Sequence, residues 1–223
     1  MSLTTATNAI NPKPFKDRIL LHGLIAWYVV WWIFLALEPI DRHDWFLENI
    51  LGIGLMIVLV TTYRTFPLSD LSYIFLTLFM TLHAVGAHYT YSKVPLGFWM
   101  QEWWGLERNH FDRIAHFSFG VLLAYPLREL FLRRVNVHGF WAYYLPISGI
   151  LAMSGFFEII ETSIVLLVRP ELGEAYLGTQ GDEWDAQKDM LVALIGAFLT
   201  IVLTYTLSKL GSAKPLPSPA KFS

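Results

Sequence analysis

Six long apolar stretches, separated by short polar links, make up most of the chain. Each is long enough to cross the roughly 30 Å hydrocarbon layer of a bilayer as a helix that rises about 1.5 Å per residue. Helices are expected because backbone groups in lipid must hydrogen-bond within their own segment. Short links favour antiparallel neighbours, so the pattern predicts an all-α polytopic membrane bundle with six transmembrane helices. The predicted spans are residues 19–37, 45–63, 71–89, 111–132, 140–168 and 185–208.

The same pattern divides the chain into three parts. They are an N-terminal segment of residues 1–18, a six-span transmembrane domain of residues 19–209 and a C-terminal tail of residues 210–223. The first span is too long for a signal-peptide core and lacks a small-residue cleavage site after it, so we expect it to stay as an anchor. The tail is rich in Pro, Ser and Lys, a composition typical of disorder.

Composition supports the membrane assignment. The chain is 55% hydrophobic and only 15% charged, whereas soluble domains carry about 25% charged residues. It contains no cysteine, which excludes disulfides and thiolate metal sites. It also has no Gly-rich phosphate loop, internal repeat or long basic run, so nucleic acid is not an expected partner. The lipid bilayer is the expected surrounding, and the oligomeric state is left open.

The positions of the charged residues predict an orientation. More of the 16 Lys and Arg residues flank the helix ends on the side of the N-terminus than the ends on the other side. By the positive-inside rule we therefore expect both termini to be cytoplasmic. Most of the 18 acidic residues then fall outside or in the outer halves of the helices. The inner halves are expected to carry almost no comparable polar groups.

This topology brings polar residues of four spans to one depth near the outer surface. A carboxylate inside an apolar span costs roughly 2.5–3.5 kcal/mol to insert, so such residues usually serve a function. Spacings of three and four residues place each pair of side chains on one helix face, except that His83 and His88 are five apart. The residues concerned are His83, His88, Asp112, His116, Glu158, Glu161, Asp185 and Asp189.

Each of these residues also has a structural interpretation. Asp182 fits a helix cap as well as a functional role, and Asp44 is expected to be simply the cap of the second helix. Asp112 could pair with Arg113 or Arg108 at the interface. For Glu158, Glu161, His116 and Asp189, the structural alternative is a buried hydrogen-bonded network. Such bonds average only about 0.6 kcal/mol in membranes, less than the cost of inserting the group, so a functional role is favoured.

The link between the third and fourth spans is rich in aromatic residues. Trp99 and Trp103 are four residues apart, which places both on one face of a short helix. Because Trp is favoured at the lipid–water boundary, we expect a short interfacial helix here. A plain aromatic anchor is the favoured interpretation, and a lid over the polar cluster is compatible with it.

Three motifs carry a family resemblance: NHFDRIAHFSFG, LRELF and GDEWDAQKDMLVALIGA. They resemble the bacterial inner-membrane proteins typified by YjdF, over nearly the whole chain. This resemblance implies a location in the bacterial cytoplasmic (inner) membrane, but it implies no mechanism. The last three spans are also loosely similar to VanZ-like membrane proteins, a family associated with resistance to a glycopeptide antibiotic. That similarity concerns Asp112, His116, Glu158 or Glu161, Asp185 and Asp189.

Three functions fit the outward-facing His/carboxylate site. The first is an enzyme that uses acid/base or metal-assisted chemistry on a lipid or lipid-linked substrate. The second is a proton-coupled small-molecule transporter, and the third is a non-catalytic protein that binds a lipid, a drug or a partner. For the enzyme, the catalytic candidates are Asp112, His116, Glu158 and Asp185, and Arg108 and Arg113 are candidates to hold a phosphate or headgroup. The candidate ligands for a divalent transition metal are His83, His116, Glu158, Glu161 and Asp189.

Overall fold

The structure is a computed structural model that describes residues 14–168 and 179–212, and within those residues all regular secondary structure is helical. The predicted all-α class is therefore confirmed. Most of the predicted N-terminal segment and of the predicted tail lies outside the described residues. The elements are η1 (Phe15–Asp17), α1 (Ile19–Ala36), α2 (Arg42–Thr62), α3 (Asp70–Tyr89), η2 (Tyr91–Lys93), α4 (Pro95–Trp104), α5 (Phe111–Arg134), α6 (Trp141–Val168) and α8 (Asp185–Ser212).

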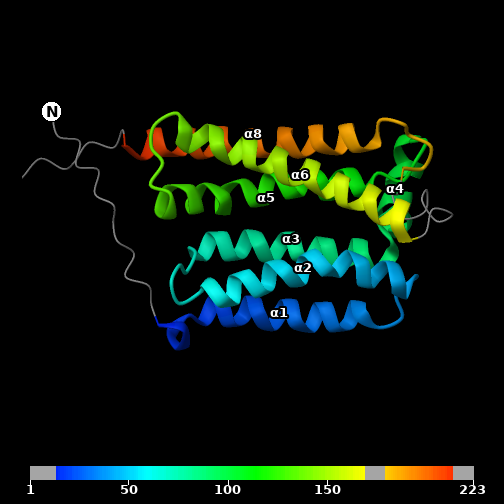
Figure 1. Cartoon of the computed structure of the whole chain (residues 1–223), viewed down its shortest axis with the longest axis horizontal. Helices are drawn as coiled ribbons and strands as arrows, with labels where there is room; N and C mark the ends of the chain where they lie inside the picture. The colour runs from blue at the N-terminus through cyan, green and yellow to red at the C-terminus, as the bar shows by residue number, and fades with distance from the viewer. Residues whose placement is uncertain (1–13, 169–178, 213–223) are drawn as a thin grey trace, which may run out of the picture.

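The long helices lie side by side with successive ones antiparallel, as Figure 1 shows. Helices α1, α2 and α3 form one group, and α5, α6 and α8 form the other. Contacts between α3 and α5 join the two groups, while α4 lies across the end of the bundle at which α5 and α8 begin. We call this end the site end, on the right in Figure 1, and the other the opposite end.

The most extensive helix contact is between α5 and α8, and small residues allow it. A Cβ atom on Gly120 would overlap the backbone carbonyl of Ala193, and one on Gly196 would overlap the carbonyl oxygen of Phe117. Thr200 Oγ1 also donates a hydrogen bond of 2.8 Å to the carbonyl oxygen of Val121 across this contact. Small residues let transmembrane helices approach closely, so this packing fixes the distance between the first turns of α5 and α8.

A compact apolar core lies between the helices, and apolar side chains also cover the outside. Residues of α1 and α2 such as Val30 and Val60 are largely exposed, as expected for helices that face lipid tails rather than water. Helix α1 is held to α3 by Trp31, whose Nε1 donates to the carbonyl oxygen of Thr81 at 3.1 Å. The buried core residues are Leu76, Leu123, Ala124, Ile150, Ala193, Ala197 and Ile201.

Five of the described helices are long and apolar enough to cross a membrane: α1, α2, α3, α6 and α8. The chain is thus a multi-pass membrane protein. Helix α5 spans 24 residues and packs against α3, α6 and α8, but it carries charged residues at both ends. The six-span count and the orientation across the membrane therefore stay predictions.

Two local features test the sequence analysis directly. The cap of α2 is Asp41, whose carboxylate accepts from the backbone N–H groups of His43 and Asp44. The expectation that Asp44 caps this helix is wrong, because Asp44 lies inside the first turn and is buried. The short helix between the third and fourth spans is confirmed as α4, with Trp99 and Trp103 exposed on its surface.

Candidate functional site

His116, in the second turn of α5, is the centre of the polar group at the site end. Its ring is buried, and its Nε2 atom lies 3.3 Å from Glu158 Oε1 of α6 and 3.7 Å from Asp112 Oδ1 one turn earlier. The other ring nitrogen, Nδ1, lies 3.4 Å from Ser154 Oγ. The imidazole is thus held between a hydroxyl group on one side and two carboxylates on the other.

Asp189 of α8 completes this group, which we call the His116 cluster (Asp112, His116, Glu158 and Asp189). One ligand atom from each of Asp112, His116 and Asp189 lies within 4.8 Å of the other two. Asp189 is 1% exposed, and its Oδ1 atom and Glu158 Oε1 have no hydrogen-bond partner among the described residues. Buried polar atoms are normally paired, so this arrangement requires a proton, a water molecule or a cation between the carboxylates.

Two arginines form an ion-pair network that adjoins the cluster and contacts it through Asp189. Arg113 contacts Asp185 at 2.5 Å, Asp189 at 2.5 Å and Asp182 at 3.1 Å. Arg108 contacts Asp185 at 2.6 Å. Asp185, predicted as a catalytic residue, therefore binds two guanidinium groups and lies outside the His116 cluster. Arg108 and Arg113, which were predicted to hold a phosphate or headgroup, therefore form ion pairs with carboxylates of the protein itself.

Asp182 lies where the described chain resumes before α8. Its carboxylate accepts from the backbone N–H of Trp184 at 3.1 Å and from Lys188 Nζ at 2.6 Å. The Lys188 hydrogen bond is the main cause that lowers the pKa of Asp182 below its ordinary value. Asp182 thus anchors the segment before α8, but α8 begins three residues later at Asp185, so Asp182 does not occupy the N-cap position that one interpretation gave it.

His83 of α3, a predicted metal ligand, has both ring nitrogens in contact with other groups of the protein. Burial raises the pKa of Tyr91 well above its ordinary value, so the phenol stays protonated and can donate to His83 Nδ1 at 2.5 Å. The other nitrogen, Nε2, then carries a proton and faces the carbonyl oxygen of Glu48 at 3.2 Å. Both ring nitrogens are used, so His83 lines the site without a free lone pair.

Further carboxylates surround the His116 cluster. Asp44 Oδ1 and Glu48 Oε2 of α2 are buried without a hydrogen-bond partner among the described residues. Glu161 of α6, another predicted ligand, lies close enough to Glu48 and Asp112 to interact with them electrostatically. The site end therefore holds more buried carboxylates than Arg108 and Arg113 can balance. In a low dielectric, like charges so close cannot all stay ionised without protons or a cation.

Tyr91 is the residue of this site that the sequence analysis missed. It lies in η2, directly after α3, and its ring occupies the space where a Cβ atom on Gly86 would be. A glycine near the end of an apolar helix, followed by a tyrosine in the next turn, was the available signal. His88, the other histidine of α3 at this end, lies with Nδ1 2.8 Å from the carbonyl oxygen of Leu35.

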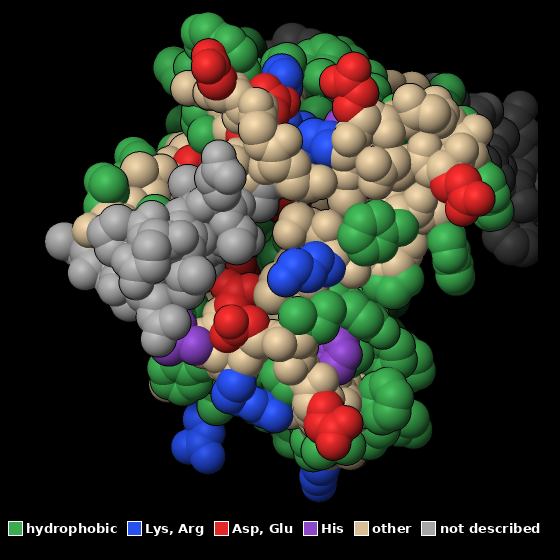
Figure 2. Space-filling model, turned by 90° about the vertical axis from the view of Figure 1, so that its right-hand side faces the viewer, with side chains coloured by type: hydrophobic (Ala, Val, Ile, Leu, Met, Phe, Trp, Pro, Cys, Tyr) green, Lys and Arg blue, Asp and Glu red, His purple; other side chains and the backbone are tan. Residues whose placement is uncertain are grey.

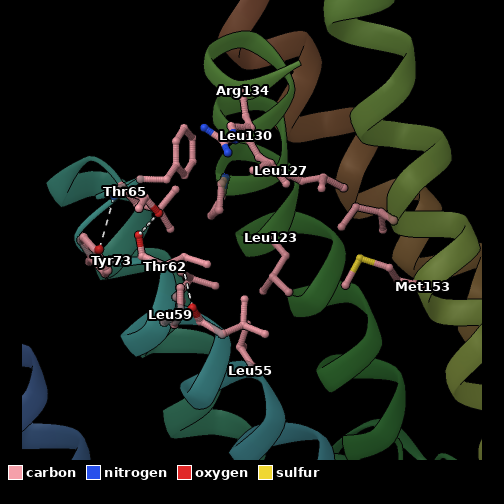
Figure 3. A pocket seen from close by; sticks show the side chains of 16 residues that line it. Leu55, Leu59, Thr62, Thr65, Tyr73, Leu123, Leu127, Leu130, Arg134 and Met153 are labelled. Carbon is pink, nitrogen blue, oxygen red and sulfur yellow. Dashed lines mark hydrogen bonds between the residues drawn. The ribbon is translucent and has the colours of Figure 1, made fainter. Parts of the chain in front are cut away.

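Two cavities lie between the two groups of helices. The first, of about 280 Å³, is lined by Asp112, His116, Ser154 and His83 together with apolar side chains. The second, also of about 280 Å³, extends toward the opposite end and is lined mostly by apolar side chains, many of them leucines, with Thr65 and Arg134 at its far side (Figure 3). Both share Leu55, Leu123 and Met153. A polar site thus adjoins apolar space that runs along the helices.

The site end also carries charged side chains on its surface. Figure 2 looks onto this end and shows acidic and basic side chains gathered among hydrophobic ones. The aromatic residues of α4 are exposed near it. The polar site therefore lies next to a charged surface rather than at the centre of an apolar bundle.

The opposite end corrects one expectation, namely that it would carry almost no buried polar groups. Glu129 of α5 is buried and accepts hydrogen bonds from the Ser69 backbone N–H at 2.8 Å and from Ser72 Oγ at 2.5 Å. It also forms an ion pair with Arg133. Because its partners satisfy it, Glu129 holds α3 against α5 and differs from the unpaired carboxylates of the site end.

Comparisons with known proteins agree with the fold. A family model described as "Predicted membrane protein (DUF2238)" matches residues 20–209. The chain is 37% identical over 171 residues to Inner membrane protein YjdF of Escherichia coli (strain K12), which covers 76% of this chain and 81% of that protein. No solved structure matches the chain. These matches confirm the resemblance to the proteins typified by YjdF and lend no support to the VanZ-like similarity.

Proposed function

We propose that this chain, which belongs to the membrane-protein family described as DUF2238, is an inner-membrane enzyme acting on a lipid or lipid-linked substrate. The reaction takes place at the His116 cluster and uses acid/base or metal-assisted chemistry. The cluster faces the extracytoplasmic side, in keeping with the predicted cytoplasmic termini. An inner-membrane location agrees with the E. coli relative, whose name places it in the inner membrane.

One observation carries this proposal: His116 Nε2 lies 3.3 Å from Glu158 Oε1, while Asp189 Oδ1 beside it is buried without a hydrogen-bond partner. A network built only to hold helices together would pair these atoms, as the chain does for Glu129. Groups that stay unpaired in a buried cluster are typical of sites that bind a ligand or move a proton.

The cluster fits a divalent transition metal. Histidine nitrogen and carboxylate oxygens are the ligands that Zn, Mn and Fe accept, and Asp112, His116 and Asp189 bring one such atom each within 4.8 Å of the others. Ser154 beside Nδ1 of His116 and Arg113 on Asp189 match the outer hydrogen bonds that orient metal ligands. Bound there, the metal would polarise a phosphoryl or carbonyl oxygen and lower the pKa of a water molecule.

The residues also define roles in proton transfer. In this proposal Ser154 fixes the His116 ring, so that Nε2 faces the reacting group. Glu158 Oε1 lies 3.3 Å from Nε2, and Glu158 serves as the general acid or base. Asp112, one turn before His116, keeps the ring in place. Asp185 and Arg113 position Asp189 and do not touch the substrate.

The cavities favour an amphiphilic substrate. The polar group of such a substrate would lie in the first cavity and reach His116. Its acyl or prenyl chain would extend past Leu55, Leu123 and Met153 into the second cavity. Ligand sites of mostly apolar lining with a few polar groups are common for small molecules. The apolar stretch between the two ends supports a lipid more than a transported ion, which would need polar groups along the whole path.

Lipid turnover tests the proposal. The purified protein in nanodiscs is incubated with a total bacterial lipid extract, and lipids are followed by mass spectrometry. We expect a product that accumulates with time, is lost in His116→Ala and Glu158→Gln, and is kept in Glu102→Gln. Glu102 is the matched control because it is exposed on α4. Absence of any product, with lipid bound equally by all variants, would overturn the enzyme proposal and favour a non-catalytic lipid-binding protein.

A further inference from the structure

A third pocket lies at the opposite end, between α5, α6 and α8, away from the His116 cluster. It encloses about 520 Å³. Three basic or titratable nitrogen side chains line it, one from each of α5 and α8 and one from the link before α6, and among the described residues no carboxylate does. The lining residues that matter here are Arg128, His138, Lys209, Tyr143 and Tyr205.

Arg128 is the inner residue of this pocket. Its guanidinium carbon lies 4.8 Å from the centre of the Tyr143 ring, and its Nε atom is buried without a hydrogen-bond partner among the described residues. Two other arginines at this end have carboxylate partners, Arg133 with Glu129 and Arg18 with Asp70. Buried donors are normally satisfied, so Arg128 has donor capacity for an anion that the chain does not supply.

Lys209 brings a second positive charge to the pocket from α8. Its Nζ atom lies 5.6 Å from the centre of the Tyr205 ring, and that ring packs edge-on against Tyr143 at 5.3 Å. The two cations thus rest on neighbouring tyrosine rings that are themselves in contact. Cation–π contacts of this kind hold long basic side chains in place, so two helices present their charges toward one space.

The level of the pocket in the membrane follows from the aromatic residues beside it. Phe140, Trp141 and Tyr144 are exposed and pack on one another at 5.5–5.7 Å between ring centres. Exposed aromatic groups at helix ends mark the depth of the lipid headgroups. Phe140 also lines the pocket, so the pocket opens at the depth where phosphates of the bilayer lie.

We propose that this pocket binds the phosphate group of an anionic phospholipid. Arg128 and Lys209 would contact the phosphate, His138 would lie at its edge, and apolar residues such as Leu132 would border the acyl chains. Basic pockets between transmembrane helices are known to take anionic headgroups in this way. A lipid fits better than a soluble phosphate because the lining is half apolar and lies at headgroup depth. The proposal does not depend on the His116 cluster.

Lipid retention measured by native mass spectrometry tests the site. The full-length protein is released from nanodiscs that contain equal amounts of phosphatidylglycerol and phosphatidylcholine, and bound lipids are counted. We expect retained phosphatidylglycerol on the native chain, reduced about fivefold in Arg128→Gln and in Lys209→Gln, since each basic residue near the surface contributes about 1 kcal/mol. Arg128→Lys keeps the charge and should restore most of the binding.

Arg64→Gln is the matched control for charge. Arg64 is exposed in the link between α2 and α3 at the same end, and it does not line the pocket. Equal retention by the native protein, Arg128→Gln and Lys209→Gln would overturn the proposal, and so would an equal loss in Arg64→Gln. Displacement of the lipid by millimolar inorganic phosphate, with phosphate then bound in its place, would overturn the lipid assignment. If Arg128→Gln does not fold, Lys209→Gln tests the same pocket from the other helix.

Discussion

Glu158 Oε1 of α6 lies 3.3 Å from His116 Nε2 of α5. This contact joins two helices whose polar residues lie far apart in the sequence. It also places an unpaired carboxylate oxygen in a buried site that already holds Asp112 and Asp189. Crowding of this kind reduces stability and is kept where function requires it.

Replacement of Glu158 by glutamine should therefore raise stability while it removes activity. The change keeps the shape of the side chain and removes one negative charge from a cluster of like charges. In the presence of a chelator we expect a gain of about 0.5–2 kcal/mol in the free energy of unfolding, seen as a higher melting temperature in detergent. Glu102→Gln should change nothing, and a clear loss of stability in Glu158→Gln would contradict the crowding argument.

The contact between α5 and α8 gives a second prediction. Gly120→Ala adds a Cβ atom that overlaps the carbonyl group of Ala193, and helices in contact through backbone cannot adjust as a flexible side chain can. We expect a loss of about 1–3 kcal/mol, the usual cost of overpacking, measured by thermal unfolding. Gly54→Ala is the control, because nothing lies within 4 Å of a Cβ atom at that position. Equal melting temperatures for the two variants would argue against this packing.

Glu129 gives a third prediction, for the opposite end. Glu129→Ala removes a buried carboxylate that Ser69, Ser72 and Arg133 contact, and it leaves their donors and charge without a partner. The expected loss is about 3–5 kcal/mol. Asp70→Asn is the control, because its ion pair with Arg18 has an exposed carboxylate. A Glu129→Ala protein as stable as the control would mean that this network does not hold α3 to α5.

The orientation across the membrane can be tested because the chain has no cysteine. Single cysteines at Glu102 and at Arg64 lie at the site end and at the opposite end. With cytoplasmic termini, a membrane-impermeant maleimide should label Glu102→Cys in intact spheroplasts and Arg64→Cys only after the membrane is opened. The reverse pattern would place the His116 cluster on the cytoplasmic side.

The hydrophobic pattern was enough to predict the helical class and the bounds of the long helices within a few residues. Residues three or four apart on one helix, such as Asp112 and His116, were also correctly placed on one face. The partners of each side chain were not predictable, because they depend on how helices rotate against each other. Asp185 pairs with Arg108 and Arg113 rather than with His116. His83 forms a hydrogen bond with the hydroxyl group of Tyr91.

At the opposite end, too, the partners of the polar side chains could not be predicted from the sequence. Glu129 and Arg133 are a turn apart and look like a surface ion pair, yet Ser69 and Ser72 of α3 bury the carboxylate. Arg128 is the residue directly before Glu129. Only the packing of α5 against α6 and α8 places it over Tyr143 in a pocket.

Metal content tests the central proposal most directly. The protein is purified without a metal-affinity step, and bound metals are measured by inductively coupled plasma mass spectrometry. We expect stoichiometric Zn, Mn or Fe in the native chain and in Glu102→Gln, and its loss in His116→Ala and Asp189→Asn variants that remain folded. A native protein free of metal, or variants that retain the metal unchanged, would contradict a metal centre formed by Asp112, His116 and Asp189.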